Sequence, residues 1–394
     1  MDKHRDFYEL HKDEKKQRLK EIAFVFLKLG ITAFGGPAAH VAMMDDEVVK
    51  KRKWLSRESF LDLYGATNLI PGPNSTELAI HLGYERGGLW GLIIAGVCFI
   101  FPAMLIVMIF AAVYREYGSL PEISGIMYGI KPVIIAVILQ ALLGLGKSAL
   151  KNKSAVFLFL IIVALSYLGY HEIFLLFLSG LAMTLIVNRK KIKLGRMSLY
   201  IPAVSLSLSD ISARATLGEG MDISSIFLTF FKIGSVLYGS GYVLLAFLET
   251  YFVEQFKVIT TQQLLDAVSI GQFTPGPVFT TATFIGYIIH GIPGAVAATI
   301  GIFLPAFVLV GILNNILPKL RNSSWIAGIL DGVNVASLAL MAVVSLKLGA
   351  AAIIDAPTLI LAVLSAIVVF KYSINSAWLV LAGGTAGFLF TALL

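Results

Sequence analysis

The sequence has little charge and almost no cysteine. Only 14% of its 394 residues are charged, whereas 57% are hydrophobic and the mean hydropathy is +0.84. A soluble globular protein carries about 25% charged residues, so the composition excludes that class. The single cysteine, Cys98, lies inside an apolar run, which excludes a disulfide within the chain and a cysteine-based metal cage. No HExxH or GxSxG pattern occurs, so we expect no metal site and no cofactor. We also expect that the protein is not an enzyme.

What the sequence does contain is long apolar runs. Leu89–Val113 is an uncharged run of 25 residues, and the runs 356–370 and 376–394 are separated by the single charge of Lys371. About 20 apolar residues in a helix span the ~30 Å hydrocarbon core of a bilayer. The sequence therefore predicts an all-α, multi-pass protein of the cell (inner or plasma) membrane.

The basic residues are better explained by membrane orientation than by nucleic acid. The net charge is +7, but the Lys and Arg residues form short clusters between hydrophobic runs. Residues 1–21 hold seven Lys/Arg and six Asp/Glu and have no apolar core, so they are not a secretory signal peptide. We expect this segment to be a cytoplasmic lead-in.

The chain repeats itself with an offset of 204 residues. Lys28 and Gly30 align with Lys232 and Gly234, and the triplet 71–73 aligns with 275–277, both Pro-Gly-Pro. This self-similarity predicts two homologous halves, residues 22–196 and 225–394. Residues 197–224 would be a linker, with one extra crossing near residues 197–209 if the halves are inverted.

The distribution of positive charge favours inversion. Short cytoplasmic loops are rich in Lys and Arg. In the first half these clusters are 50–57, 147–153 and 189–196, and the segment 58–86 then enters the membrane and returns. The clearest positive charges of the second half are Lys319, Arg321 and Lys371. They lie in loops whose equivalents in the first half would be on the outer side of the membrane. We therefore predict inverted repeats with a cytoplasmic N-terminus.

Each half contains two elements that break a hydrophobic helix. The first is Gly30–His40, which contains Gly-Gly-Pro and matches Gly234–Leu244; the second is the Pro-Gly-Pro triplet. Secondary transporters with inverted repeats place their substrate site near the membrane midplane, where broken helices meet. Half-helices that begin after such breaks present N–H groups and a positive dipole end, which suits an anion.

At these segments the sequence resembles the chromate ion transporter family in its long-chain, two-half form. The motifs are FGGPAAHVAMM from Phe34, PGPNSTELAIHLGY from Pro71 and GQFTPGPVFTTATFIGY from Gly271, with Trp54 and Phe60 between the first two. The resemblance covers nearly the whole chain. It implies a secondary transporter that exports chromate, is driven by the proton motive force and confers chromate resistance. The alternative is the same alternating-access mechanism acting on sulfate or another oxyanion, in export or uptake.

A tetrahedral dianion requires cationic, N–H or O–H donors in its site. The residues predicted to contact it are Lys28, Lys232, Gly35, Gly36, Gly239, Ser240, Asn68, Pro71, Gly72, Pro73, Asn74, Thr76, Gln272, Thr274, Pro275, Gly276, Pro277 and Thr280. The lysines could instead extend to the interface, and the amide and hydroxyl side chains could instead cap the broken helices. The sequence leaves open whether two copies form a homodimer.

Glu77 and His40 are the candidates for proton coupling. Glu77 would repel an anion when ionised, so it would serve either as a buried proton carrier or as a partner of Lys28 or Arg86. His40 could titrate near neutral pH or be a hydrogen-bonded structural residue.

Lys131 and Asp331 have opposite charges at equivalent positions, with an offset of 200 residues. They could pair across the two halves. The sequence favours the alternative that they are unrelated interfacial residues, with Lys131-Pro132 marking a helix entry.

Overall fold

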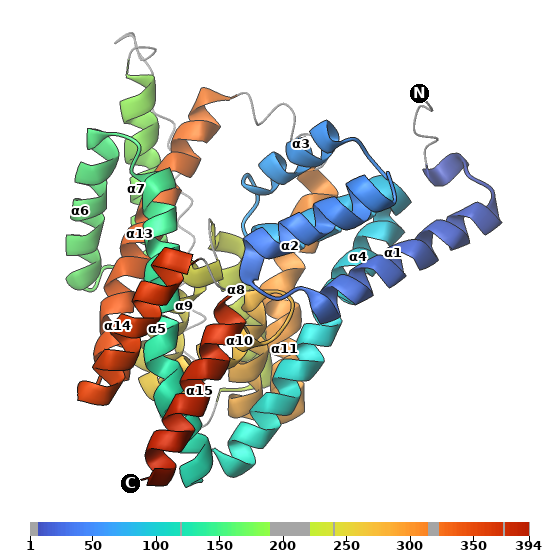
Figure 1. Cartoon of the computed structure of the whole chain (residues 1–394). Coiled ribbons are helices and arrows are strands. Elements are labelled where there is room, and N and C mark those ends of the chain that lie inside the picture. The colour runs from blue at the N-terminus through green and yellow to red at the C-terminus, as the bar shows by residue number, and fades with distance from the viewer. Residues whose placement is uncertain are drawn as a thin grey trace.

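A computed structural model describes residues 7–118, 120–189, 221–238, 241–313, 323–372 and 375–393, and these residues form helices and connecting turns without strands. The first half contains η1 (Phe7–Glu9), α1 (Lys12–Thr32), α2 (Gly36–Met44), the π-helix η2 (Asp45–Lys51), α3 (Arg57–Thr67), α4 (Asn74–Tyr117), α5 (Pro121–Ala149), α6 (Lys153–Tyr167) and α7 (Glu172–Asn188). The second half contains α8 (Ile223–Val236), η5 (Gly241–Val243), α9 (Leu244–Leu248), the π-helix η6 (Glu249–Gln255), α10 (Thr261–Phe273), η7 (Val278–Thr280), α11 (Thr281–Leu313), α13 (Ser324–Ala352), α14 (Ala356–Tyr372) and α15 (Ser376–Leu393). Figure 1 shows their arrangement.

Four segments of the described chain are long and apolar enough to cross a membrane, judged by length and composition. They are Asn74–Tyr117, Pro121–Ala149, Val278–Ile312 and Ser324–Ala352. The extra crossing expected near residues 197–209 lies outside the described residues, as does most of the linker 197–224.

The backbones of the two halves follow the same path. α4 leaves helical geometry at Gly87 (φ −141°, ψ 19°) and Gly88 (φ 58°, ψ −152°). α11 does so at His290 (φ −141°, ψ 29°) and Gly291 (φ 60°, ψ −149°), 203 residues later. A positive φ at a non-glycine residue is uncommon, yet Lys53 and Lys257 both have one, 52° and 53°. The repeat in the sequence is therefore a repeat in the fold.

These interruptions make α4 and α11 sharp helical hairpins. Gly83 packs directly on Gly91 across the α4 turn, and Gly286 packs on Gly294 across the α11 turn. A side chain at any of these glycines would collide with the facing backbone carbonyl. The segment 58–86 accordingly folds as α3, the Pro-Gly-Pro break and the first arm of the α4 hairpin. That this segment enters the membrane and returns stays a prediction.

Equivalent helices of the two halves pack antiparallel. Gly146 of α5 faces Leu338 of α13, and Ile135 of α5 faces Gly349 of α13, so the sequence numbers run in opposite directions. α4 and α11 also cross in opposite directions, with Leu92 facing Gly311. A two-fold axis that relates antiparallel helices is perpendicular to them, which is the geometry of an inverted repeat.

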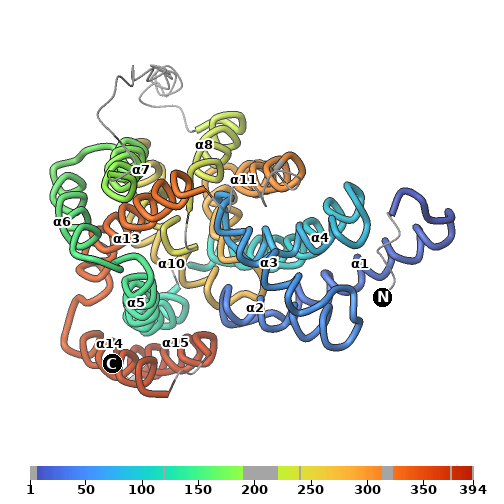
Figure 2. The backbone as a smooth tube through the Cα atoms, turned by 90° about the horizontal axis from the view of Figure 1, so that it is seen from above, coloured from blue at the N-terminus to red at the C-terminus, as the bar shows by residue number. Residues whose placement is uncertain are grey.

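The last two helices of each half pack against the other half. α6 and α7 of the first half pack on α13, and α14 and α15 of the second half pack on α5 (Figure 2). α1 packs on α4, and α8 packs on α11 in the same way. Lys131-Pro132 lies inside α5, which begins ten residues earlier at Pro121, so the expectation that it marks a helix entry is wrong.

Candidate functional site

The two Pro-Gly-Pro breaks are hydrogen-bonded to opposite halves of the protein. The Gly72 N–H donates to the Leu237 carbonyl at 2.8 Å, and the Gly276 N–H donates to the Ala33 carbonyl at 2.9 Å. Leu237 and Ala33 are themselves equivalent, each directly following α8 or α1. The pair of bonds therefore obeys the two-fold symmetry. These two N–H groups join the halves and are not free to bind a ligand.

Both positions require glycine. Gly72 and Gly276 have φ values of 136° and 86°, which L-residues rarely adopt. A Cβ at position 72 would overlap the Glu77 carboxylate, and a Cβ at position 276 would lie 2.8 Å from the Ala103 Cβ. The glycines thus allow the close approach of the two halves.

His40 supports this junction from α2. Its Nε2 lies 3.1 Å from the Ala33 carbonyl, and its Nδ1 lies 3.2 Å from the Ser75 hydroxyl. With Nε2 protonated, the imidazole donates to the carbonyl that also accepts from Gly276 and accepts from the serine. The side chain is buried at 1% exposure, so this arrangement is the structural role that the sequence left open beside proton coupling.

A polar cavity of about 220 Å³ opens beside the first break. Its polar lining residues are Asn68 at the end of α3, Asn74 at the start of α4, Ser148 near the end of α5, and Asn334 and Ser337 in the first part of α13. Leu145, Ala149, Val243 and Leu338 complete the wall. Among the described residues that line this cavity, none is charged.

The first turn of α4 meets the cavity at Asn74. Pro73 is the N-cap and supplies no side-chain cap, and the Thr76 N–H donates to the Pro73 carbonyl at 2.7 Å. The Asn74 amide donates to Asn68 Oδ1 at 2.9 Å, and the remaining amide hydrogens of both residues can face a ligand. A helix N-terminus with neutral donors around it favours an anion.

The second break is closed by comparison. Thr274 donates to the Gly271 carbonyl at 3.2 Å, and Thr280 donates to the Pro277 carbonyl at 2.8 Å. Gln272 accepts from the Tyr242 hydroxyl at 3.1 Å. All three predicted contact residues are buried, at 5%, 0% and 6% exposure. Val278 stands where the first break has Asn74, whereas the buried Gln272 Nε2 has no hydrogen-bond partner among the described residues and is a donor on this side.

Comparison of the sequence with known proteins identifies the family of this chain. The family model described as "Chromate transporter" matches residues 20–184 and again residues 224–388. The chain belongs to the chromate transporter family. A chromate transport protein of Cupriavidus metallidurans is 28% identical over 372 residues, covering 93% of this chain and 91% of that protein. A probable chromate transport protein of Synechococcus elongatus is 30% identical over 359 residues, 90% of each chain. A chromate transport protein of Pseudomonas aeruginosa is 28% identical, covering 92% of this chain and 90% of that protein.

No solved structure matches the chain. Membership of the chromate transporter family makes the protein a membrane transporter with an oxyanion substrate, and it argues against an enzyme. The fold agrees with that family assignment, because the two matched regions coincide with the two halves of the structure.

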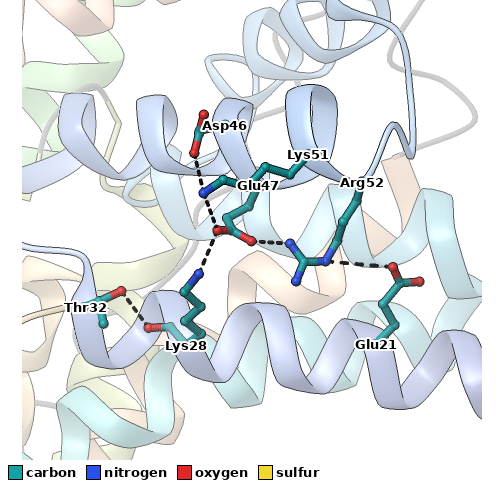
Figure 3. Close-up of polar contacts among 7 residues, drawn as sticks. All are labelled: Glu21, Lys28, Thr32, Asp46, Glu47, Lys51 and Arg52. Atoms are coloured by element: carbon teal, nitrogen blue, oxygen red, sulfur yellow. Dashed lines mark hydrogen bonds and ion pairs between the residues drawn. The ribbon is translucent and has the colours of Figure 1, made fainter.

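In this protein, Lys28 belongs to a network of ion pairs (Figure 3). Its ammonium extends from α1 to Glu47 Oε1 at 2.8 Å. Lys51 at 3.0 Å and Arg52 also contact the Glu47 carboxylate. The hydrogen bond from Lys28, together with those from Lys51 and Arg52, lowers the pKa of Glu47 to about 2. The Lys28 side chain is 45% exposed, but its charge is balanced by Glu47.

Lys232 has a different partner at the equivalent place. Its ammonium lies 5.0 Å from the centroid of the Tyr251 ring, and Tyr251 is the counterpart of Glu47 at the offset of 204 residues. A cation–π contact attracts the ammonium without neutralising it. Glu172 also acts electrostatically on Lys232. The two equivalent lysines therefore differ in that Lys28 contacts its carboxylate directly.

Glu77 is fully buried and follows the first break. Neither of its carboxylate oxygens has a hydrogen-bond partner among the described residues, and its exposure is 0%. Lys28 pairs with Glu47, and Arg86 pairs with Glu21 at 2.8 Å. The structure thus does not support the interpretation of Glu77 as a partner of Lys28 or Arg86.

The remaining predicted residues lie at the breaks themselves. Gly35 (φ 101°) and Gly36 (φ 78°) form the turn into α2. Pro71, Pro73 and Thr76 flank the first break, and Pro275 and Pro277 flank the second. Gly239 and Ser240 lie outside the described residues.

Sequence reasoning missed Ser148, Asn334 and Ser337. Each has an apolar residue at the equivalent position of the other half, namely Leu348, Ile134 and Val137. No motif or repeat signal marks them. Only the packing of α5 and α13 beside the first break brings them to the cavity.

Proposed function

We propose that this protein is a secondary active transporter that exports chromate across the cytoplasmic membrane, is driven by the proton motive force and confers chromate resistance. The observation that carries the proposal is the cavity at the first break. It combines the start of α4 with the side-chain amides of Asn68, Asn74 and Asn334, and it has no carboxylate in its described lining. Its two serine hydroxyls, of Ser148 and Ser337, donate to the Leu145 and Tyr238 carbonyls. Names of the related proteins support chromate as the anion.

The size and chemistry of the cavity suit a tetrahedral dianion. A volume of about 220 Å³ corresponds to roughly seven water molecules at ~30 Å³ each, which accommodates one oxyanion with a partial hydration shell. Neutral donors hold an anion without the tight binding that fixed cationic ligands would give. A carrier must release its substrate on the other side, so moderate binding serves transport.

The location of the cavity supports export with a cytoplasmic N-terminus. Ser148 lies within the basic cluster 147–153, near the end of α5. Short basic loops mark the cytoplasmic side. We therefore propose that the described conformation presents the cavity to the cytoplasm, from which chromate would enter.

For proton coupling we propose Glu77, with His40 in a supporting role. A buried carboxylate without a partner is costly when ionised and is a proton-binding group by default in a membrane interior. Its position directly behind Gly72 would let its charge state affect the junction of the halves. We further propose that Lys28 and Lys232 attract the anion, and that the glycines and prolines at the breaks position its donors.

The test is chromate flux in proteoliposomes. Purified protein with an imposed pH gradient is expected to move radiolabelled chromate against its concentration gradient, and dissipating the gradient with a protonophore should abolish the accumulation. Glu77→Gln is expected to retain downhill exchange and lose accumulation. Absence of chromate flux from folded protein would refute the substrate, and accumulation that persists without a proton gradient would refute the coupling.

A further inference from the structure

A buried ion pair lies at the end of α5 remote from the candidate cavity. The Lys131 ammonium of α5 is 3.0 Å from Asp266 Oδ1 of α10, and the Tyr114 hydroxyl of α4 donates to Asp266 Oδ2 at 2.7 Å. The side chains of Lys131 and Asp266 are only 16% and 6% exposed. Three helices are thus held together by one carboxylate.

The cluster extends to α13 through a glutamine. Lys131 also donates to Gln262 Oε1 at 2.7 Å, and Gln262 Nε2 donates to the Ala351 carbonyl at 2.7 Å. These residues line a second cavity of about 330 Å³, with Ala352 in its wall. Because α5 and α13 are antiparallel, this cavity and the candidate substrate cavity lie at opposite ends of the same helix pair.

The opposite end of the helix pair carries a looser ion pair. Lys151 and Asp331 are 2.8 Å apart, but their side chains are 59% and 36% exposed. Asp331 is the repeat counterpart of Lys131, but their partners Lys151 and Asp266 are not equivalent positions of the repeat. Lys131 and Asp331 do not pair with each other. The Lys131–Asp266 pair, which lines the second cavity, is thus much less exposed than the Lys151–Asp331 pair at the other end.

We propose that the Lys131–Asp266 pair is the gate that closes the transport path at the end opposite the candidate cavity, and that protonation of Asp266 opens it. This proposal rests on the proposed alternating-access function and adds a proton site to it. A neutral Asp266 loses most of its attraction for the ammonium, so the link between α5 and α10 weakens. α10 leads directly into the second Pro-Gly-Pro break, so its release can move that break.

The surroundings of Asp266 contain few other charges. Lys131 and Tyr114 are the ionisable groups in contact with its carboxylate. Tyr128 lines the same cavity, but its hydroxyl donates to Asp355 at 2.7 Å. α13 contributes only Ala351 and Ala352 to the cavity wall, and α11, α15 and η7 contribute none of its described lining.

Two acids of η6 lie near α10 without touching Asp266. Glu249 accepts from Thr261 in the first turn of α10, and Glu254 pairs with Lys347. Among the ionisable side chains around it, Lys131 and Tyr114 are therefore the ones that contact the Asp266 carboxylate.

The test measures access to the second cavity. Ala352, which is 3% exposed, is changed to cysteine in a Cys98→Ala background, and the protein is placed in nanodiscs so that both faces meet a water-soluble maleimide. Labelling rates are normalised to those of unfolded protein at the same pH. Asp266→Asn is expected to raise the rate at least tenfold and to remove its increase at low pH.

Two further variants complete the design. Lys131→Gln is expected to raise labelling as Asp266→Asn does, and the exchanged pair Lys131→Asp with Asp266→Lys is expected to return it toward the starting rate. The matched control is Asp331→Asn at the other end, which should leave labelling of Ala352→Cys unchanged.

Labelling that stays slow in both folded single variants would overturn the gate, and pH dependence that persists in Asp266→Asn would overturn the proton site. No anion is needed for this measurement. A failed chromate flux assay and a failed gate are therefore distinguishable outcomes.

Discussion

The two Pro-Gly-Pro breaks have the same backbone and different surroundings. Each donates its glycine N–H to the other half, with nearly equal distances of 2.8 and 2.9 Å. The first then opens on a cavity lined by three asparagines and two serines, whereas the second is buried and has Val278 in place of Asn74. The symmetric backbone thus builds the junction, and the asymmetric side chains decide where an anion can bind.

The largest effect is expected from removing a junction glycine. Gly72→Ala and Gly276→Ala should each lower the free energy of unfolding by about 1–3 kcal/mol from backbone strain alone, with an added steric term. Thermal unfolding in detergent would measure this as a lower Tm. Gly144→Ala is the matched control, since nothing lies within 4 Å of a Cβ there. Equal Tm values for all three variants would contradict the junction.

Exchanging the side chains that distinguish the breaks should separate binding from folding. Asn74→Val makes the first break resemble the second, and we expect it to lower chromate transport by about 10- to 100-fold, because a hydrogen bond to a charged group contributes about 1.5–3 kcal/mol. Val278→Asn should leave transport unchanged. Flux in proteoliposomes measures both, and a larger loss in Val278→Asn would place the site at the second break.

The equivalent lysines offer a finer comparison. Lys232→Ala should reduce chromate flux by about tenfold, or ~1.4 kcal/mol. Lys28→Ala should have a smaller effect, because Glu47 already balances its charge. Initial rates at subsaturating chromate check the order. The reverse order would show that the ion pair with Glu47 opens during transport.

The smallest effect concerns acid stability. The pKa of Glu47 is about 2 in the folded protein and near 4.5 in the unfolded chain. Its stabilising contribution is therefore present above pH ~4.5 and is lost as the pH falls toward 2. Glu47→Gln should flatten the dependence of Tm on pH between about 5 and 3, and a variant that keeps the full dependence would contradict this role.

The repeat explains which features could be predicted from the sequence. The offset of 204 residues locates both Pro-Gly-Pro breaks, because glycine and proline leave a local signal in each half. The hairpin turns at Gly88 and Gly291 were not predicted. The cross-half bonds Gly72–Leu237 and Gly276–Ala33 leave no such signal, since they depend on how two distant segments approach in space. The same reason hid Ser148 and Ser337, because only the packing of α5 and α13 brings them to the cavity.

The partners of the charged side chains could not be predicted from the sequence either. Glu47 belongs to the run DEVVKKRK, where several acid–base pairings are equally compatible with the spacing. Only the π-helix η2 turns Glu47 toward Lys28 and buries it. Lys131 likewise has no nearby acid in the sequence, and its partner Asp266 comes from the other half.

The most direct test of the central claim is to locate the anion. A structure of the protein with chromate bound, with chromium identified by its anomalous scattering, would show the site without relying on mutants. The account predicts a single strong chromium peak in the cavity beside the first break, within hydrogen-bonding distance of Asn74 and Ser337. A peak at the second break, beside Gln272 and Thr280, would contradict it.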